Sequence, residues 1–225
     1  MATQDIQIGI GALELAGTFG FPTGARGLVL FAHGSGSSRH SPRNRHVAQM
    51  LHDRGLATLL LDLLTPDEEY IDTFEATLHP QVEILAERLV AATDSVIASG
   101  RASGLPIGYF GGSTGGAAAL MAAARRPNQI AAVVARGGRL DLATACLPQV
   151  KAPTLLIVGG EDLGIAQINR EAVTRLTALH RIVIVNGATH LFEEPGALDQ
   201  VGHLAANWFL DHFHSVRPSI AQVAP

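Results

Sequence analysis

Residues 107–120 read Ile-Gly-Tyr-Phe-Gly-Gly-Ser-Thr-Gly-Gly-Ala-Ala-Ala-Leu and place a serine where a predicted strand turns into a predicted helix. The apolar run 106–110 is typical of a buried strand, and the alanine-rich segment 117–126 is a strong helix former that ends before a proline. Only residues 111–116 lie between them. Glycines two residues before and two after Ser113 permit a very tight turn. This is the pattern of a nucleophile elbow, in which a strained turn holds a reactive hydroxyl away from the backbone.

Apolar runs and helical patterns alternate along the rest of the chain. Continuous apolar runs, typical of parallel strands covered on both faces, are found at 27–33 and 57–61, and further strand candidates follow at 106–110, 130–135, 153–158 and 181–185. Helical patterns occupy 44–54, 80–99 and 198–213, and we expect a helical segment between every two of these strands. The alternation predicts an α/β fold with a mostly parallel central sheet, right-handed crossovers and helices on both faces.

The two ends of the chain have patterns of their own. Ile6, Ile8 and Ile10 alternate with polar or small residues, and a second short run follows Gly11-Ala12, which predicts an N-terminal antiparallel hairpin at one edge of the sheet. Residues 217–225 contain two prolines and little periodicity. We therefore predict a single domain over 1–216 and a loose C-terminal tail over 217–225.

Composition narrows the functional classes. The chain has 225 residues, 47% hydrophobic and 16% charged, and can bury one substantial core. A net charge of -4 argues against nucleic acid as a partner. The single cysteine, Cys146, fits a reducing compartment, and neither a secretory signal nor a run of membrane-spanning length is visible. We expect a cytoplasmic protein with no membrane partner, compatible with a homodimer.

A serine hydroxyl is a weak nucleophile that needs a base within hydrogen-bond reach, and the base needs an acceptor that fixes its tautomer. Gly-Gly-Glu161-Asp162 follows the predicted strand 153–158, and a loop ending in His190 follows the last predicted strand. Both segments fall at carboxyl ends of strands, where open parallel sheets keep their sites, and the order serine, acid, histidine is the one this kind of fold uses. We predict the triad Ser113, Asp162 and His190, and prefer Asp162 to Glu161 because its side chain is shorter.

Hydrolysis through a tetrahedral intermediate also needs two N–H donors for the oxyanion. The residue after the nucleophile, Thr114, supplies the first, and the loop after the strand 27–33 supplies the second. We predict the Ser35 amide as this second donor, with Gly34 or Gly36 as alternatives. His33, at the start of the same loop, is interpreted as a structural histidine that bonds the loop.

Four segments together resemble the α/β-hydrolase fold and, within it, the dienelactone hydrolase family of small enzymes without a cap. They are Phe-Ala-His-Gly-Ser-Gly from Phe31, Gly-Gly-Ser-Thr-Gly from Gly111, Gly-Gly-Glu-Asp from Gly159 and Gly-Ala-Thr-His-Leu-Phe from Gly187, and the resemblance runs from about Gly27 to Phe213. It implies a Ser113, Asp162, His190 triad that hydrolyses esters or lactones without a cofactor. Dienelactone hydrolases themselves use cysteine as the nucleophile, so Ser113 favours a serine carboxylesterase.

The sequence contains no segment long enough for a cap domain. The interval 136–152 has room for a turn and one short helix, predicted at 140–147. We therefore expect an open, shallow site that prefers short acyl groups, walled by the loops 35–43 and 63–79. The acidic stretch 63–79 can equally be a solvated loop without a role in the site.

Other functional classes fit fewer of the residues. A dinucleotide-binding oxidoreductase could use Gly34, Gly36 and Asp62, but Arg39 stands where the third glycine of its fingerprint belongs. A non-catalytic hydrolase-fold binding protein would not need all three triad residues. The histidines from His33 to His52 are spaced by seven, six and six residues, which puts no pair on one helix turn, so no metal site is predicted.

Overall fold

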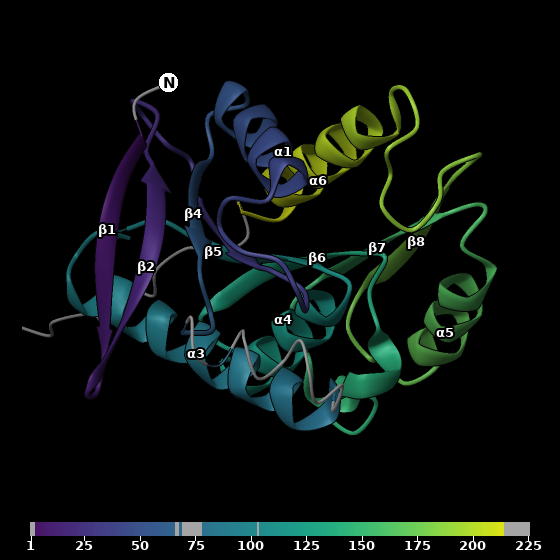
Figure 1. Cartoon of the computed structure of the whole chain (residues 1–225), viewed down its shortest axis with the longest axis horizontal. Helices are drawn as coiled ribbons and strands as arrows, with labels where there is room; N and C mark the ends of the chain where they lie inside the picture. Colours follow the sequence, from purple (N-terminus) through teal and green to yellow (C-terminus); the bar gives the residue numbers. More distant parts are fainter. Residues whose placement is uncertain (1–2, 66–67, 69–77, 103, 214–225) are drawn as a thin grey trace, which may run out of the picture.

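The described residues form one eight-stranded sheet with the order β1-β2-β4-β3-β5-β6-β7-β8 (Figure 1). The structure is a computed structural model that describes residues 3–65, 68, 78–102 and 104–213. The strands are β1 (Thr3–Ile10), β2 (Leu13–Gly20), β3 (Leu28–Ala32), β4 (Ala57–Leu61), β5 (Ile107–Gly112), β6 (Ile130–Arg136), β7 (Thr154–Gly159) and β8 (His180–Val185). β2 pairs antiparallel with β1 and β4, and the pairs from β4 to β8 are parallel. This confirms the predicted mostly parallel sheet with an N-terminal hairpin.

Helices cover both faces of the sheet (Figure 1). α1 (Pro42–Asp53) and α6 (Ala197–Phe213) lie on one face, and α3 (Leu78–Ala98), α4 (Thr114–Arg125) and α5 (Leu163–Val173) lie on the other. Strand β3 shows why both faces are apolar. Leu28 and Leu30 belong to the hydrophobic cluster under α3 and α4, whereas Val29 and Phe31 belong to the cluster under α1 and α6. Because alternate side chains of a strand point to opposite faces, a strand covered twice has to be apolar throughout.

Helix α1 begins two residues before its predicted start. The Asn44 N–H donates to the Ser41 hydroxyl at 3.4 Å, and Pro42 occupies the first helical turn. Ser41 is therefore the N-cap, and a proline at this position loses no helical hydrogen bond because the first amides of a helix have no acceptor inside it.

The connection from β6 to β7 differs from the prediction. Instead of a helix over 140–147, two short 3-10 turns form at Leu140–Ala143 and Leu147–Gln149, so the prediction of a helix between every two strands is wrong here. Pro148 explains the break, since it has no N–H to continue a helix and its ring would clash with the carbonyl four residues earlier. The connection contains no cap domain, as predicted.

Two sequence predictions lie partly or wholly outside the described residues. The tail 217–225 is not described, and of the loop 63–79 the stretch 69–77 is not described. Within that loop, Glu68 accepts two hydrogen bonds from the Arg88 guanidinium, each at 2.5 Å, and this pairing lowers the pKa of its carboxyl to about 2. Among the helices that the structure describes, none combines the length and the apolar character needed to cross a membrane.

Candidate active site

Ser113 forms the whole turn between β5 and α4. β5 runs on to Gly112 and α4 begins at Thr114, three residues earlier than predicted. Ser113 has φ 53° and ψ −123°, a left-handed backbone that is uncommon for a residue with a side chain. Its N–H donates to the Arg136 carbonyl at 3.0 Å, and its own carbonyl accepts from the Arg139 N–H at 3.1 Å. Neighbouring backbone thus holds the strained residue in place.

Glycine is required at both ends of the Gly-x-Ser-x-Gly motif because the backbones touch there. A Cβ at Gly111 would lie 2.2 Å from the Gly115 carbonyl oxygen, and a Cβ at Gly115 would lie 2.2 Å from the Ala32 carbonyl oxygen. Both distances are far below van der Waals contact, and the second partner belongs to the end of β3. The two glycines therefore let α4 pack directly against the sheet beneath the serine.

Backbone contact between two loops brings the acid and the base together. A Cβ at Gly159 would lie 2.4 Å from the Ala188 carbonyl oxygen, and the same carbonyl accepts the Glu161 N–H at 3.0 Å. The Glu161 side chain is exposed to solvent, whereas Asp162 is the N-cap residue of α5 and its carboxylate is only 16% exposed. The loop after β7 therefore directs the second of its two carboxylates toward the loop that carries His190.

A chain of hydrogen bonds links the three predicted residues. His190 Nδ1 lies 2.6 Å from Asp162 Oδ2, and His190 Nε2 lies 3.3 Å from Ser113 Oγ. An ionised carboxylate only accepts, so Nδ1 carries the proton and Nε2 is left as the acceptor of the serine O–H. This is the tautomer that a general base for the serine requires.

The predicted oxyanion donors lie next to each other in the structure. Thr114 is the first residue of α4, so its N–H has no acceptor within the helix. The Ser35 N–H donates to Thr114 Oγ1 at 2.9 Å and is therefore engaged, while the Ser35 hydroxyl donates to Gln81 Oε1 at 2.7 Å. Gly34 lies against the elbow, since a Cβ there would be 2.9 Å from the Gly112 carbonyl oxygen. Which amide is the second donor stays a prediction.

His33 is buried and bonds two loops. Its Nε2 accepts the Leu63 N–H at 2.8 Å, so its Nδ1 is the protonated nitrogen and donates to the Gly34 carbonyl at 3.0 Å. The loops after β3 and β4 are joined through this ring, which supports the structural role expected for it.

A cavity of about 210 Å³ contains the nucleophile and the base. Its lining is Gly34, Ser35, Ser37, Ser41, Arg43, Asn44, Gly112, Ser113, Arg136, His190 and Leu191. The loop 35–43 thus forms one wall, as expected. Sequence reasoning missed Arg136, Arg43 and Asn44. The one available signal was a charged residue, Arg136, at the end of the strand Ile-Ala-Ala-Val-Val-Ala-Arg, where an apolar residue is usual.

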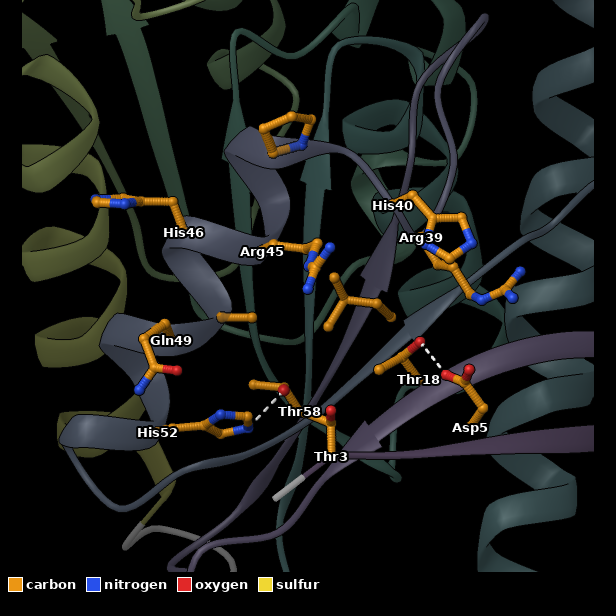
Figure 2. Close-up of a pocket in the computed structure, with 13 residues that line it drawn as sticks. Thr3, Asp5, Thr18, Arg39, His40, Arg45, His46, Gln49, His52 and Thr58 are labelled. Atoms are coloured by element: carbon orange, nitrogen blue, oxygen red, sulfur yellow. Dashed lines mark hydrogen bonds between the residues drawn. The ribbon is translucent and has the colours of Figure 1, made fainter. Parts of the chain in front are cut away.

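A larger cavity of about 570 Å³ lies elsewhere, between α1 and the N-terminal hairpin. Figure 2 shows polar side chains around it, with a hydrogen bond from Thr18 to Asp5 and another between Thr58 and His52. None of the triad residues lines it. The larger volume is therefore not where the nucleophile and its base are found.

The residues of the competing predictions are arranged differently. Asp62 Oδ1 accepts the Arg39 N–H at 2.6 Å and its other oxygen pairs with the Arg39 guanidinium, so the carboxylate that a dinucleotide ribose would need is taken. Burial raises the pKa of the Cys146 thiol to about 11, which disfavours the nucleophilic thiolate. Within the described residues, no group of three or more His, Cys, Asp or Glu side chains is arranged to hold a metal ion.

Known structures resemble this chain over nearly its whole length. A crystal structure of dienelactone hydrolase from Anabaena variabilis ATCC 29413 is 53% identical and covers 94% of this chain and 98% of its own, with a TM-score of 0.90. Est1E from Butyrivibrio proteoclasticus is 16% identical, covers 93% of this chain and 99% of its own, and has a TM-score of 0.77, which shows a shared fold alone.

Curated relatives match at similar identity but are longer. Two proteins from Mycobacterium tuberculosis, of strains CDC 1551 / Oshkosh and H37Rv, are each 48% identical over 218 residues and carry the name "Putative phosphoribosyl transferase". The match covers 96% of this chain but 48% of each relative, so the chain spans about half their length.

The family model of the dienelactone hydrolase family matches residues 16–212, which include the elbow and both loops that carry the acid and the base. The α/β-hydrolase fold and these matches support a hydrolase. By this match and by its likeness to the Anabaena structure, the chain belongs to the dienelactone hydrolase family.

Proposed function

We propose that this protein is a serine hydrolase that cleaves small carboxylic esters or lactones through an acyl-enzyme intermediate. One observation carries the proposal: the hydrogen-bonded chain from Asp162 Oδ2 through the His190 ring to Ser113 Oγ. A serine hydroxyl becomes an effective nucleophile when a neighbouring base with a fixed tautomer can accept its proton.

In the acylation half-reaction, Ser113 Oγ attacks the ester carbonyl while its proton moves to His190 Nε2. The resulting imidazolium is stabilised by the Asp162 carboxylate, and the negative charge on the carbonyl oxygen is stabilised by the Thr114 N–H together with a donor from the loop 34–36. When the tetrahedral intermediate collapses, the bond to the alcohol oxygen breaks, and that oxygen takes the proton from His190.

Deacylation repeats the steps with water. His190 Nε2 removes a proton from the water, whose oxygen attacks the acyl carbonyl, and the bond to Ser113 Oγ then breaks as the serine recovers its proton. For a lactone, the alcohol stays attached to the acyl group, so a single hydroxy acid is released. No cofactor is needed for any of these steps.

Short acyl groups suit the proposed site best. The β6–β7 connection contains two 3-10 turns, and the cavity at Ser113 has a volume of about 210 Å³. A long acyl chain would leave most of its methylenes in water and gain little of the roughly 0.8 kcal/mol available per buried CH₂.

The names of the related proteins do not all support the proposed ester or lactone substrate to the same degree. The Anabaena protein is called a dienelactone hydrolase and its match covers 94% of this chain, which supports an ester or lactone substrate. The transferase name belongs to proteins about twice as long as this chain. It therefore does not say whether the half that matches this chain or the other half would have the transferase activity. We further propose a cytoplasmic location, in keeping with a single cysteine, and leave the homodimer to be tested by light scattering.

A fluorophosphonate reagent tests the proposal directly. It should add once, at Ser113, and a panel of activated esters, lactones and amides should then rank the substrates. Labelling at Ser35 or Ser37 would refute the elbow as the nucleophile. Absence of both labelling and hydrolysis would favour the non-catalytic binding protein.

A further inference from the structure

Gln81 is a buried polar residue among mostly apolar neighbours. It lies near the start of α3 and is 7% exposed, while Val82 and Leu85 of the same helix are fully buried in the hydrophobic core. Burying an amide costs free energy unless hydrogen bonds replace its water. Gln81 Oε1 accepts from the Ser35 hydroxyl at 2.7 Å. The helix residue therefore reaches the loop after β3, which borders the cavity at Ser113.

The hydrogen bonds of Ser35 form a short network in which every direction is fixed. An amide oxygen only accepts, so the Ser35 O–H donates to Gln81. The Ser35 and Thr114 hydroxyl oxygens lie 3.2 Å apart, and because the Ser35 proton is already used, the Thr114 O–H is the donor between them. Thr114 Oγ1 in turn accepts the Ser35 N–H at 2.9 Å. Each hydroxyl thus donates once and accepts once.

This network sets the direction of the Ser35 N–H. The preceding residue is held by packing, since a Cβ at Gly34 would be 2.9 Å from the Gly112 carbonyl oxygen. Ser35 itself is exposed to solvent, whereas Thr114 is 3% exposed. The Ser35 N–H is therefore oriented from its buried side, by the two buried side chains of the network. Hydrogen bonds in such surroundings are not readily exchanged for water, and they reinforce one another.

The Ser35 N–H lies where a second oxyanion donor is needed, but it has an acceptor in the resting structure. Ser35 lines the cavity with Ser113, and its acceptor belongs to Thr114, whose own N–H is the predicted first donor. A neutral ester carbonyl gains little by displacing a hydroxyl oxygen from this N–H. A charged oxygen forms hydrogen bonds roughly twice as strong as a neutral one and can displace it. An interaction made only with the oxyanion raises kcat without tightening substrate binding.

We propose that Gln81 is a positioning residue of the oxyanion hole. Through the Ser35 hydroxyl it holds the Ser35 N–H beside the Thr114 N–H, and this donor moves from Thr114 Oγ1 to the substrate oxygen as negative charge develops there. The inference rests on the proposed function and deepens it, because it selects Ser35 from the loop 34–36 as the second donor. It also gives a role to a helix residue that does not line the cavity.

Gln81→Met removes the amide and keeps the length of the side chain. We expect kcat on p-nitrophenyl acetate to fall by roughly 10- to 100-fold, somewhat less than the loss of a whole oxyanion donor, and KM to stay within about two-fold. Gln167→Met is the matched control, since Gln167 is exposed on α5 and bonds only Glu171 among the described residues. It should keep the wild-type kcat.

A pair of ketones reports on the oxyanion hole directly. Phenethyl trifluoromethyl ketone adds the serine to form a hemiketal oxyanion, whereas phenethyl methyl ketone binds as a neutral ketone. In Gln81→Met the inhibition constant of the fluorinated ketone should rise by about the factor by which kcat/KM falls, because both depend on the same donors. The inhibition constant of the methyl ketone should not change. A role in folding alone would not separate the two ketones.

A double-mutant cycle shows whether Gln81 acts through Ser35. Ser35→Ala removes the hydroxyl that Gln81 holds but keeps the Ser35 N–H, so the double variant should be no slower than Ser35→Ala alone. Thermal melts followed by circular dichroism identify a variant that fails to fold. If Gln81→Met does not fold, Gln81→Asn takes its place, because its amide is one methylene short of Ser35.

The outcomes separate this inference from the proposed function. Unchanged inhibition by the fluorinated ketone in the Gln81 variant, or losses of kcat that multiply in the double variant, would overturn the positioning role while leaving a serine esterase. If the wild type hydrolyses no ester and Ser113 is not labelled by the fluorophosphonate, the proposed function fails, and the positioning role fails with it.

Discussion

Helix α1 borders two cavities that differ in whether a buried or partly buried guanidinium has a carboxylate partner. In the larger, of about 570 Å³, the Arg39 guanidinium has Asp62 as its partner and His52 Nε2 lies 2.7 Å from Thr58 Oγ1 (Figure 2). The smaller, of about 210 Å³, contains Ser113 with its base and the unpaired Arg136.

The difference shows that volume is a poor guide to chemistry in this molecule. The larger cavity also has buried atoms without a hydrogen-bond partner, Arg39 Nε and His52 Nδ1, but its partly buried guanidinium is paired with a carboxylate. Paired charges of this kind contribute mainly to the folded state. A strained serine, an adjacent imidazole and an uncompensated cation are costly arrangements that a reaction can use. The comparison therefore predicts that substitutions at the small cavity affect catalysis, whereas those at the large cavity affect stability.

The largest expected effect is at the nucleophile. Ser113→Ala should lower kcat on p-nitrophenyl acetate by about 10⁴-fold or more, since only binding and oxyanion stabilisation remain. Arg45→Ala changes a residue that lines only the larger cavity and should keep activity near that of the wild type. If steady-state kinetics show Arg45→Ala to be the more damaging change, the assignment of the two cavities is reversed.

Next in size is the carboxylate that orients the base. Asp162→Asn should lower kcat by roughly 10³- to 10⁴-fold, because an amide favours the wrong imidazole tautomer. The adjacent Glu161→Gln is the matched control and should have little effect, since the Glu161 side chain is exposed. A greater loss in Glu161→Gln than in Asp162→Asn would show that the other carboxylate acts.

Acyl chain length probes the size of the small cavity. Across a p-nitrophenyl ester series, kcat/KM should be highest from acetate to butyrate and fall beyond about six carbons. The described lining of the cavity offers little apolar side-chain surface besides Leu191, so longer chains gain little transfer free energy there. The rate should not rise at a lipid interface. Faster hydrolysis of palmitate than of butyrate would reveal an acyl tunnel and contradict the open site.

Glycine substitutions test the backbone contact beneath the nucleophile. A Cβ at Gly115 would meet the Ala32 carbonyl oxygen at 2.2 Å, so Gly115→Ala should lower the free energy of unfolding by about 1–3 kcal/mol or more. Gly164 of α5 has no atom within 4 Å of an added Cβ, so Gly164→Ala should raise the free energy of unfolding by roughly 0.5–1 kcal/mol. Urea unfolding measures the free energy of unfolding of both variants. Equal changes in Gly115→Ala and Gly164→Ala would contradict a close contact between Gly115 and the Ala32 carbonyl.

The smallest expected effect lies at the larger cavity. Burial lowers the pKa of His52, so the unfolded chain binds a proton more readily there than the folded one does. Its contribution to stability is therefore complete above the unfolded pKa of about 6.5 and is lost as the pH falls through the lower folded value. Urea unfolding at pH 8 and pH 5 should show a smaller pH dependence in His52→Gln than in the wild type. If the pH dependence of the free energy of unfolding is the same in His52→Gln as in the wild type, this histidine does not contribute to it.

Much of the fold could be predicted because its signals are local. Apolar runs and further strand candidates predicted the six strands β3 to β8. Five of these strands are buried at every residue, whereas β8, at the edge of the sheet, is only partly buried. Helix ends were less predictable. The strand before Ser113 and the helix after it both extend into the glycine segment 111–116, because glycines that suit a turn also permit the close contacts of Gly111 and Gly115 inside regular structure.

The sequence by itself determined the alternation of strands and helices, the serine elbow and the acid and histidine at later strand ends, because these depend on glycines and apolar patterns within a few residues. Only the tertiary structure decided that Glu161 faces solvent, that the Ser35 N–H is bonded to Thr114, and that Arg136 is buried without a carboxylate. Ser35 and Thr114 are 79 positions apart along the chain. The hydrogen-bond partner of a polar group depends on which distant part of the chain lies next to it in the folded protein. A local sequence pattern does not contain that information.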